Sequence, residues 1–183
     1  MRYEVLIAGM GGQGVILAGT VIGTAITVFG GKSATQIASY GPEARGGRVY
    51  TQLVISDGEV DYPLVRRPDI VIAMSQRAFD EFARRVREGG LVIFDEDLVE
   101  PRDAPSWAEL TPIPATRVAD GLGLRRSANM VMVGVLTAVC ELLEPDAVRE
   151  AIRYRLGHRY LDINLKAFEL GYQLGLRFAR GRR

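Results

Sequence analysis

Runs of apolar residues alternate with helix-type patterns along the first half of the chain. Continuous apolar segments occupy residues 3–8, 69–74 and 91–95, which is typical of parallel strands buried on both faces. Helical spacing of apolar residues follows two of them, at 15–28 and 76–88. This order predicts an α/β fold that is Rossmann-like, with a mostly parallel sheet and helices on both faces.

Two further stretches complicate this pattern and predict a β-hairpin inserted into it. Residues 33–39 are expected to form the second strand, and residues 48–55 are rich in β-prone side chains. The turn at Asp57-Gly58 then allows residues 60–65 to return as the second strand of the hairpin. Pro63 predicts that this return strand is short or lies at an edge.

The second half of the chain is mainly helical in pattern. Residues 96–114 contain four of the eight prolines and predict a long irregular connection with a short strand at 110–113. Four helix-type segments follow, at 115–122, 130–143, 146–156 and 161–179. No internal repeat interrupts this order, so we expect residues 1–183 to form a single domain.

Composition narrows the possible functions. The 23 basic and 22 acidic residues give a net charge of +1, which does not favour a nucleic-acid partner. No apolar segment is long enough to predict a membrane span or a secretory signal, and a cytoplasmic protein is therefore expected. A single cysteine, Cys140, and a single histidine, His158, predict neither a metal site nor an iron–sulfur cluster in this chain.

Two glycine-rich segments are the strongest candidates for a binding site. Gly9-Met10-Gly11-Gly12-Gln13-Gly14 matches the pattern G-x-G-x-x-G between the first strand and the helix at 15–28, where free N–H groups favour anions. The second segment, Tyr40–Gly47, follows the second strand. Because carboxyl ends of parallel strands share one edge of a sheet, we expect both segments to lie together there.

Arg45 and Arg48 flank Gly46-Gly47 and place permanent cations beside an accessible backbone. With Asn129, the two glycine segments would form an anion or phosphate site. The alternative is a structural turn whose arginine pairs with Glu43 or Asp95. The second strand does not end in the acidic residue that holds the ribose in NAD-binding folds.

Three motifs in this order resemble one known family. They are Gly9-Met10-Gly11-Gly12-Gln13-Gly14, then Tyr40-Gly41-Pro42-Glu43-Ala44-Arg45-Gly46-Gly47, then Ser127-Ala128-Asn129-Met130-Val131-Met132-Val133-Gly134. Together the motifs resemble the gamma subunit, or gamma domain, of the 2-oxoacid:ferredoxin oxidoreductases that act on pyruvate, 2-oxoglutarate, 2-oxoisovalerate or indolepyruvate. The likeness covers nearly the whole chain.

The resemblance implies a role in a complex. Such enzymes convert a 2-oxoacid and coenzyme A to acyl-CoA and CO2, and pass electrons to ferredoxin. Thiamine diphosphate, Mg2+ and iron–sulfur clusters would belong to partner subunits of the alpha, beta and delta types, and the isolated chain would be inactive. By the same resemblance, this chain helps to bind coenzyme A through Gly9, Gly11, Gly12, Gln13, Gly14, Arg45, Gly46, Gly47 and Asn129, without catalytic or metal-binding residues of its own.

Two alternatives stay open at the level of the sequence. The chain could be an independent NAD(P)-binding oxidoreductase with a Rossmann-like fold. It could also be a purely structural subunit whose glycine segments contact only neighbouring subunits. The helix at 15–28 carries no charged residue, so we expect it to be deeply buried, under the core or under another subunit.

Overall fold

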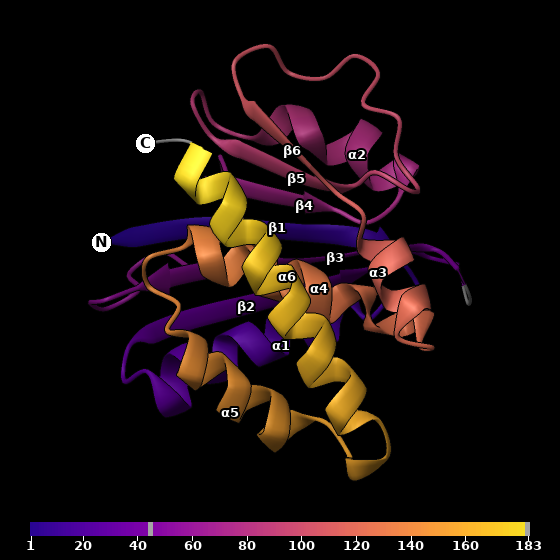
Figure 1. The fold of residues 1–183 in the computed structure, drawn as a ribbon. Coiled ribbons are helices and arrows are strands. Elements are labelled where there is room, and N and C mark those ends of the chain that lie inside the picture. Colours follow the sequence, from indigo (N-terminus) through magenta and orange to yellow (C-terminus); the bar gives the residue numbers. More distant parts are fainter. Residues whose placement is uncertain (44–45, 182–183) are drawn as a thin grey trace.

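A computed structural model of the chain describes residues 1–43 and 46–181 and contains one six-stranded sheet (Figure 1). The strands lie in the order β2-β3-β1-β4-β5-β6. Their bounds are β1 Arg2–Met10, β2 Ser33–Tyr40, β3 Arg48–Ser56, β4 Ile70–Ala73, β5 Leu91–Asp95 and β6 Glu109–Ile113. β1, β4, β5 and β6 are parallel, whereas β3 runs antiparallel to both β1 and β2.

Six α-helices accompany the sheet within the described residues. They are α1 Val15–Thr24, α2 Gln76–Phe82, α3 Ala115–Gly121, α4 Ala128–Val139, α5 Pro145–Arg155 and α6 Leu161–Gly181. Four shorter helical segments adjoin them: the π-helical η1 Ala25–Phe29, and the 3-10 segments η2 Ala83–Arg85, η3 Arg125–Ser127 and η4 His158–Tyr160. None of these helices is long and apolar enough to cross a membrane.

Helices cover both faces of the sheet, as the sequence predicts. Side chains from α1, α4, α5 and α6 pack on one face against Val5, Ile72 and Ile93, whereas α2 covers the other face over Leu6 and Phe94. Because both faces are covered, successive residues of β1, β4 and β5 are buried regardless of which way they point. The continuous apolar runs in these strands follow from that placement.

An antiparallel strand pair interrupts the parallel order, but the hairpin predicted from residues 48–55 and 60–65 does not form. β2 and β3 form an antiparallel pair, and residues 60–65 form no strand. β3 has β2 on one side and β1 on the other, so no edge of β3 stays free for a return strand. The segment after β3 is held instead by the β1 side chains Arg2, which donates to the Tyr62 carbonyl, and Glu4, which accepts from the Arg66 N–H.

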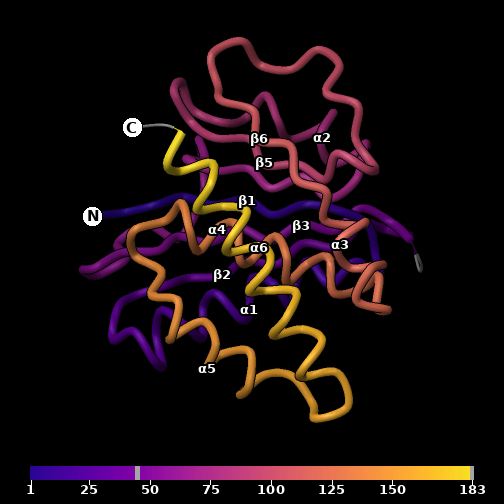
Figure 2. The backbone as a smooth tube through the Cα atoms, in the orientation of Figure 1, coloured from indigo at the N-terminus to yellow at the C-terminus, as the bar shows by residue number. Residues whose placement is uncertain are grey.

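The long irregular connection and its short strand are confirmed. Residues 96–108 contain no helix or strand and loop beyond one edge of the sheet before β6 begins (Figure 2). Trp107 fastens this loop by donating from Nε1 to the Val86 carbonyl at 3.1 Å. The apolar run predicted as a helix to residue 143 ends earlier, because the backbone turns extended at Cys140 after α4.

Candidate functional site

Both glycine segments lie at one edge of the sheet. We call residues 9–14 loop 1 and residues 40–47 loop 2. β1 and β2 run in the same direction because each is antiparallel to β3, so loop 1 and loop 2 start from the same edge although the two strands are not neighbours. The Gly11 N–H donates to the Gly47 carbonyl at 2.8 Å, which confirms the predicted meeting of the two loops.

Loop 1 turns into α1 through glycines that adopt left-handed backbone conformations. Gly12 has φ 92° and Gly14 has φ 74°, values that L-residues with a Cβ rarely adopt. Gly14 is the N-cap of α1, no side chain caps the helix, and its first turn contains no acidic residue. The first turn of α1 therefore supplies no anion of its own to the positive end of the helix dipole.

Gln13 holds loop 1 in place from the inside. Its Oε1 accepts from the Met10 N–H at 2.7 Å, and its Nε2 donates to the Met74 carbonyl just after β4, also at 2.7 Å. The oxygen and the nitrogen of the Gln13 amide thus both form hydrogen bonds with backbone groups. A Cβ on Gly9 would lie 2.5 Å from the same Oε1, so Gly9 leaves room for this brace.

Asn129, in the first turn of α4, reaches loop 1 from across the core. Its Nδ2 donates to the Gly14 carbonyl at 3.1 Å. The residue is 3% exposed, yet among the described residues its Oδ1 is the one buried side-chain polar atom without a partner. Buried acceptors are normally satisfied, so an oxygen without a donor is an unusual feature of this site.

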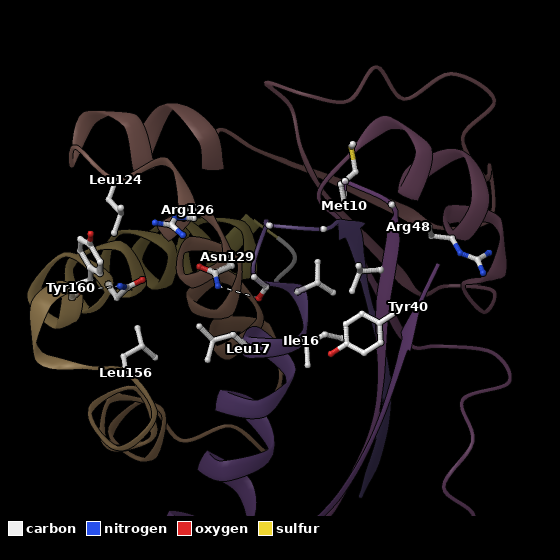
Figure 3. Close-up of a pocket in the computed structure, with 18 of the residues that line it drawn as sticks. Met10, Ile16, Leu17, Tyr40, Arg48, Leu124, Arg126, Asn129, Leu156 and Tyr160 are labelled. Carbon is white, nitrogen blue, oxygen red and sulfur yellow. Dashed lines mark hydrogen bonds between the residues drawn. The ribbon is translucent and has the colours of Figure 1, made fainter. Parts of the chain in front are cut away.

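These elements surround a cavity of about 600 Å³ (Figure 3). Loop 1, the first turn of α1 and loop 2 line one part of it, and η3, η4 and the starts of α4 and α6 line the rest. Leu124, Leu156 and Tyr160 supply apolar wall on the side of Asn129, and Met10 and Tyr40 do so on the side of loop 2 (Figure 3). Such a mixture of apolar walls and a few convergent polar groups is typical of ligand sites.

The arginines at this cavity differ in how their charge is used. Arg48 forms an ion pair with Glu81 of α2 and lies over the Tyr50 ring. Arg126 and Arg159 line the cavity, and no carboxylate of residues 1–43 or 46–181 pairs with either of them. Among the described residues that line the cavity, the arginines free to meet an anion are therefore Arg126 and Arg159, rather than Arg48.

Loop 2 is also fastened to α2. The Arg77 guanidinium lies 3.4 Å from the Glu43 carboxylate, and the pKa of Glu43 is lowered, first by its own backbone N–H and then by Arg77. Glu43 is therefore engaged by Arg77, whereas Arg45 falls outside the described residues. This ion pair supports the alternative in which loop 2 is a purely structural turn. The alternative predicted that Glu43 pairs with an arginine beside Gly46-Gly47, however, whereas Arg77 belongs to α2.

A smaller cavity of about 240 Å³ lies on the other side of loop 1 and shares Gly12 and Arg126 with the larger one. Gln13 and the fully buried Asp95 line it. Burial raises the pKa of Asp95, and hydrogen bonds from the Thr116 hydroxyl at 2.6 Å and the Asp97 N–H at 3.1 Å oppose that shift. Asp95 therefore joins β5 to α3, and no arginine of residues 1–43 or 46–181 forms an ion pair with it.

The predicted site residues separate into groups. Those that line the larger cavity are Gly11, Gly12, Gly14, Gly46, Gly47 and Asn129. Gln13 lines the smaller cavity, and Gly9 lines neither. The sequence interpretation missed Arg126, Arg159 and Tyr160. Arg126 stands three residues before Asn129 and could have been included with the third motif. Arg159 and Tyr160 belong to η4, which only the tertiary fold brings to the site.

Possible metal ligands do not gather at this site. Among the residues that the structure describes, no three His, Cys, Asp or Glu side chains are grouped so that they could hold a metal ion. Burial raises the pKa of the Cys140 thiol to about 11, and this side chain lies in the core away from both cavities. The larger cavity thus offers binding groups: backbone N–H groups, two cations and a buried amide.

Comparison with known proteins places the chain among enzymes of 2-oxoacid metabolism. Residues 4–174 match the family model described as pyruvate ferredoxin/flavodoxin oxidoreductase. The 2-oxoglutarate synthase subunit KorC of Methanocaldococcus jannaschii is 40% identical over 95% of this chain and 94% of its own. The ketoisovalerate oxidoreductase subunit VorA of Methanothermobacter marburgensis is 37% identical, over 93% of this chain but 36% of its own.

A solved structure agrees with these relatives. The gamma subunit of a keto/oxoacid ferredoxin oxidoreductase from Geobacter sulfurreducens superposes with a TM-score of 0.85 at 33% identity, covering 97% of this chain and 98% of its own. The match extends over nearly the whole of both chains rather than over one motif. The chain therefore belongs to the pyruvate ferredoxin/flavodoxin oxidoreductase family.

Proposed function

We propose that this chain is the gamma-type subunit of a 2-oxoacid:ferredoxin oxidoreductase and that its larger cavity binds the coenzyme A that the enzyme consumes. The complete enzyme converts a 2-oxoacid and coenzyme A to acyl-CoA and CO2 and passes electrons to ferredoxin. Thiamine diphosphate, Mg2+ and the iron–sulfur clusters are carried by alpha-, beta- and delta-type partners. The chain acts as one domain, in the cytoplasm.

The unpartnered Oδ1 of Asn129 is the observation that carries the coenzyme A assignment. A purely structural turn would gain nothing from a buried acceptor without a donor, since such a group costs about 1–3 kcal/mol. A ligand that places an amide N–H or a hydroxyl beside loop 1 would satisfy it. Coenzyme A has such donors in its pantetheine arm and its ribose, close to its phosphates.

The other groups of the cavity match the remaining chemistry of coenzyme A. The free N–H groups at the start of α1, with Arg126 and Arg159, would neutralise phosphate oxygens. Leu124, Leu156 and the Tyr160 ring offer apolar surface to an adenine base or to the pantetheine arm. The role of this chain is to bind and orient coenzyme A, while the partner subunits supply the reacting groups.

The test compares two adjacent arginines in the assembled enzyme. Arg126→Ala removes an unpaired cation from the cavity, whereas Arg125→Ala removes one that already pairs with Asp120 at 2.9 Å. Loss of one charge-assisted hydrogen bond, about 1.5 kcal/mol, should raise the KM for coenzyme A about tenfold in the Arg126 variant. The Arg125 variant should leave this KM within about twofold.

The rival structural role predicts a different pattern. If loop 1 and its surroundings serve assembly alone, Arg126→Ala weakens the complex, and the KM for coenzyme A in the surviving complex stays at the wild-type value. Gel filtration of the complex before the kinetic assay separates these outcomes. Tight binding of NAD(H) by the isolated chain would instead support an independent oxidoreductase.

A further inference from the structure

Arg126 and Arg159, the described arginines of the larger cavity without an ion pair, lie at the same end of it. Arg126 and Tyr160 stand on one side of α1 (Figure 3), and Arg159 precedes Tyr160 in η4. Met10 and Tyr40 stand on the other side of α1, beside loop 2 (Figure 3). We call these two parts of the cavity the η4 end and the loop 2 end.

The loop 2 end offers no free charge from the described residues. Two charged side chains of residues 1–43 and 46–181 line it, Glu43 and Arg48. Arg48 forms an ion pair with Glu81, and Glu43 forms one with Arg77. A strongly charged group of a ligand therefore finds its counter-charge at the η4 end and not beside loop 2.

The two arginines of the η4 end have different surroundings. Arg126 and Gly12 line the smaller cavity as well as the larger one, so Arg126 stands beside loop 1, at the border between the cavities. Arg159 lines only the larger cavity, and its guanidinium carbon lies over the Tyr160 ring, 5.1 Å from the centroid. Nδ2 of Asn164 in α6 donates to the Tyr160 carbonyl at 2.8 Å and fixes η4 in place.

Coenzyme A, the ligand of the proposed function on which this inference rests, carries phosphate in two separate positions. Its diphosphate joins the pantetheine arm to the adenosine, and a phosphate monoester is attached to the 3′-oxygen of the ribose. The monoester carries a charge of about −1.5 to −2 at neutral pH. The diphosphate fits loop 1, because the N–H groups at the start of α1 and the Arg126 guanidinium are both there.

We propose that Arg159 binds the 3′-phosphate of coenzyme A and thereby sets the direction in which the molecule lies in the cavity. With Arg126 beside the diphosphate, Arg159 is the remaining unpaired arginine among the described residues that line the cavity. A guanidinium presents its N–H groups in a fork that matches phosphate oxygens. The adenosine then lies at the η4 end, where Leu156 and Tyr160 supply apolar surface to the base.

The loop 2 end suits the other arm of the molecule. The pantetheine arm carries no charge and ends in the thiol. Met10, which is 42% exposed, and Tyr40, which is 69% exposed, offer it uncharged surface. The thiol therefore leaves the cavity beside loop 2, and Arg159 distinguishes coenzyme A from dephospho-coenzyme A.

Dephospho-coenzyme A, which lacks only the 3′-phosphate, tests this assignment in the assembled enzyme. Arg159→Ala should raise the KM for coenzyme A about tenfold and leave the KM for dephospho-coenzyme A within about twofold of the wild-type value. Arg126→Ala should raise both KM values by the same factor, because both molecules contain the diphosphate. Arg153→Ala is the matched control and should change neither, since Arg153 pairs with Glu150 at 2.6 Å and lies outside the cavity lining.

Equilibrium binding to the same complex separates affinity from turnover. AMP and adenosine 3′,5′-bisphosphate differ only in the 3′-phosphate, and titration calorimetry gives the dissociation constant of each. The wild type and Arg153→Ala should bind the bisphosphate about tenfold more tightly than AMP, and Arg159→Ala should bind both equally. Tyr40→Ala should raise the KM for both coenzymes and leave the affinity for the bisphosphate unchanged, because Tyr40 meets only the pantetheine arm.

The outcomes separate this inference from the proposed function. If Arg159→Ala changes the two KM values equally, or still prefers the bisphosphate to AMP, then the 3′-phosphate does not bind at Arg159, although coenzyme A can still occupy the cavity. Weaker binding of the bisphosphate by Tyr40→Ala would mean that the molecule lies in the opposite direction. If Arg126→Ala leaves both KM values unchanged in an intact complex, the proposed function itself fails.

Discussion

Substitution of Gly14 by alanine tests how loop 1 is held, because two separate costs meet at this residue. Gly14 has φ 74°, and a residue with a Cβ pays about 1–2 kcal/mol in this conformation. The added Cβ would also lie 2.3 Å from Nδ2 of Asn129. The amide must then move, which removes its hydrogen bond to the Gly14 carbonyl at a further cost of about 0.5–1.5 kcal/mol.

The expected total is a loss of about 1.5–3.5 kcal/mol in the free energy of unfolding. Gly12→Ala is the matched control, because Gly12 also has a positive φ, of 92°, but a Cβ there meets no atom within 4 Å. This variant should lose about 1–2 kcal/mol, the backbone cost alone. Urea unfolding followed by circular dichroism measures both values.

A third variant isolates the contact with the amide. In an Asn129→Ala background the Cβ of alanine 14 meets no amide, so the Gly14 substitution should cost about the same as the one at Gly12. The reasoning is refuted if Gly14→Ala costs no more than Gly12→Ala in the wild-type background, or if Asn129→Ala leaves its cost unchanged. Either result would show that Asn129 does not hold the entrance of α1.

Three further predictions concern the core and its titratable groups. Gly171→Ala should destabilise the chain by about 3 kcal/mol or more, because a Cβ at this position would lie 2.0 Å from the Val131 carbonyl oxygen, where α6 crosses α4. Gly181→Ala is the control, because a Cβ there would meet no atom within 4 Å, and it should leave thermal unfolding unchanged. Burial raises the pKa of Cys140 to about 11, so a thiol reagent at pH 8 should label this residue at the rate of unfolding, and immediate labelling of the native chain would contradict its placement. Burial raises the pKa of Asp95, so the folded state binds this proton more tightly than the unfolded state, and the free energy of unfolding falls as pH rises through the pKa of the folded state. Asp95→Asn should remove this fall in urea titrations between pH 4 and 7. A variant with the same pH profile as the wild type would refute this assignment to Asp95.

Periodicity and apolar content by themselves determined the elements that lie in the centre of the molecule. The continuous apolar runs at residues 3–8, 69–74 and 91–95 became β1, β4 and β5, because a strand covered on both faces has no polar side to display. The glycines of loop 1 likewise allowed a turn with positive φ, which the structure has at Gly12 and Gly14. These features are local, and local sequence is sufficient to predict them.

Pairing partners and the full composition of the site depended on tertiary structure. The β propensity of a stretch does not show which strand it will pair with. Residues 60–65 cannot pair with β3, as predicted, because β1 and β2 already pair with its two edges. Arg126, Arg159 and Tyr160 reach the cavity because α4 and α6 pack together and bring η3 and η4 beside loop 1. Arg48, one of the two arginines that flank Gly46-Gly47, pairs with Glu81 of α2, a helix that begins 28 residues further along the chain.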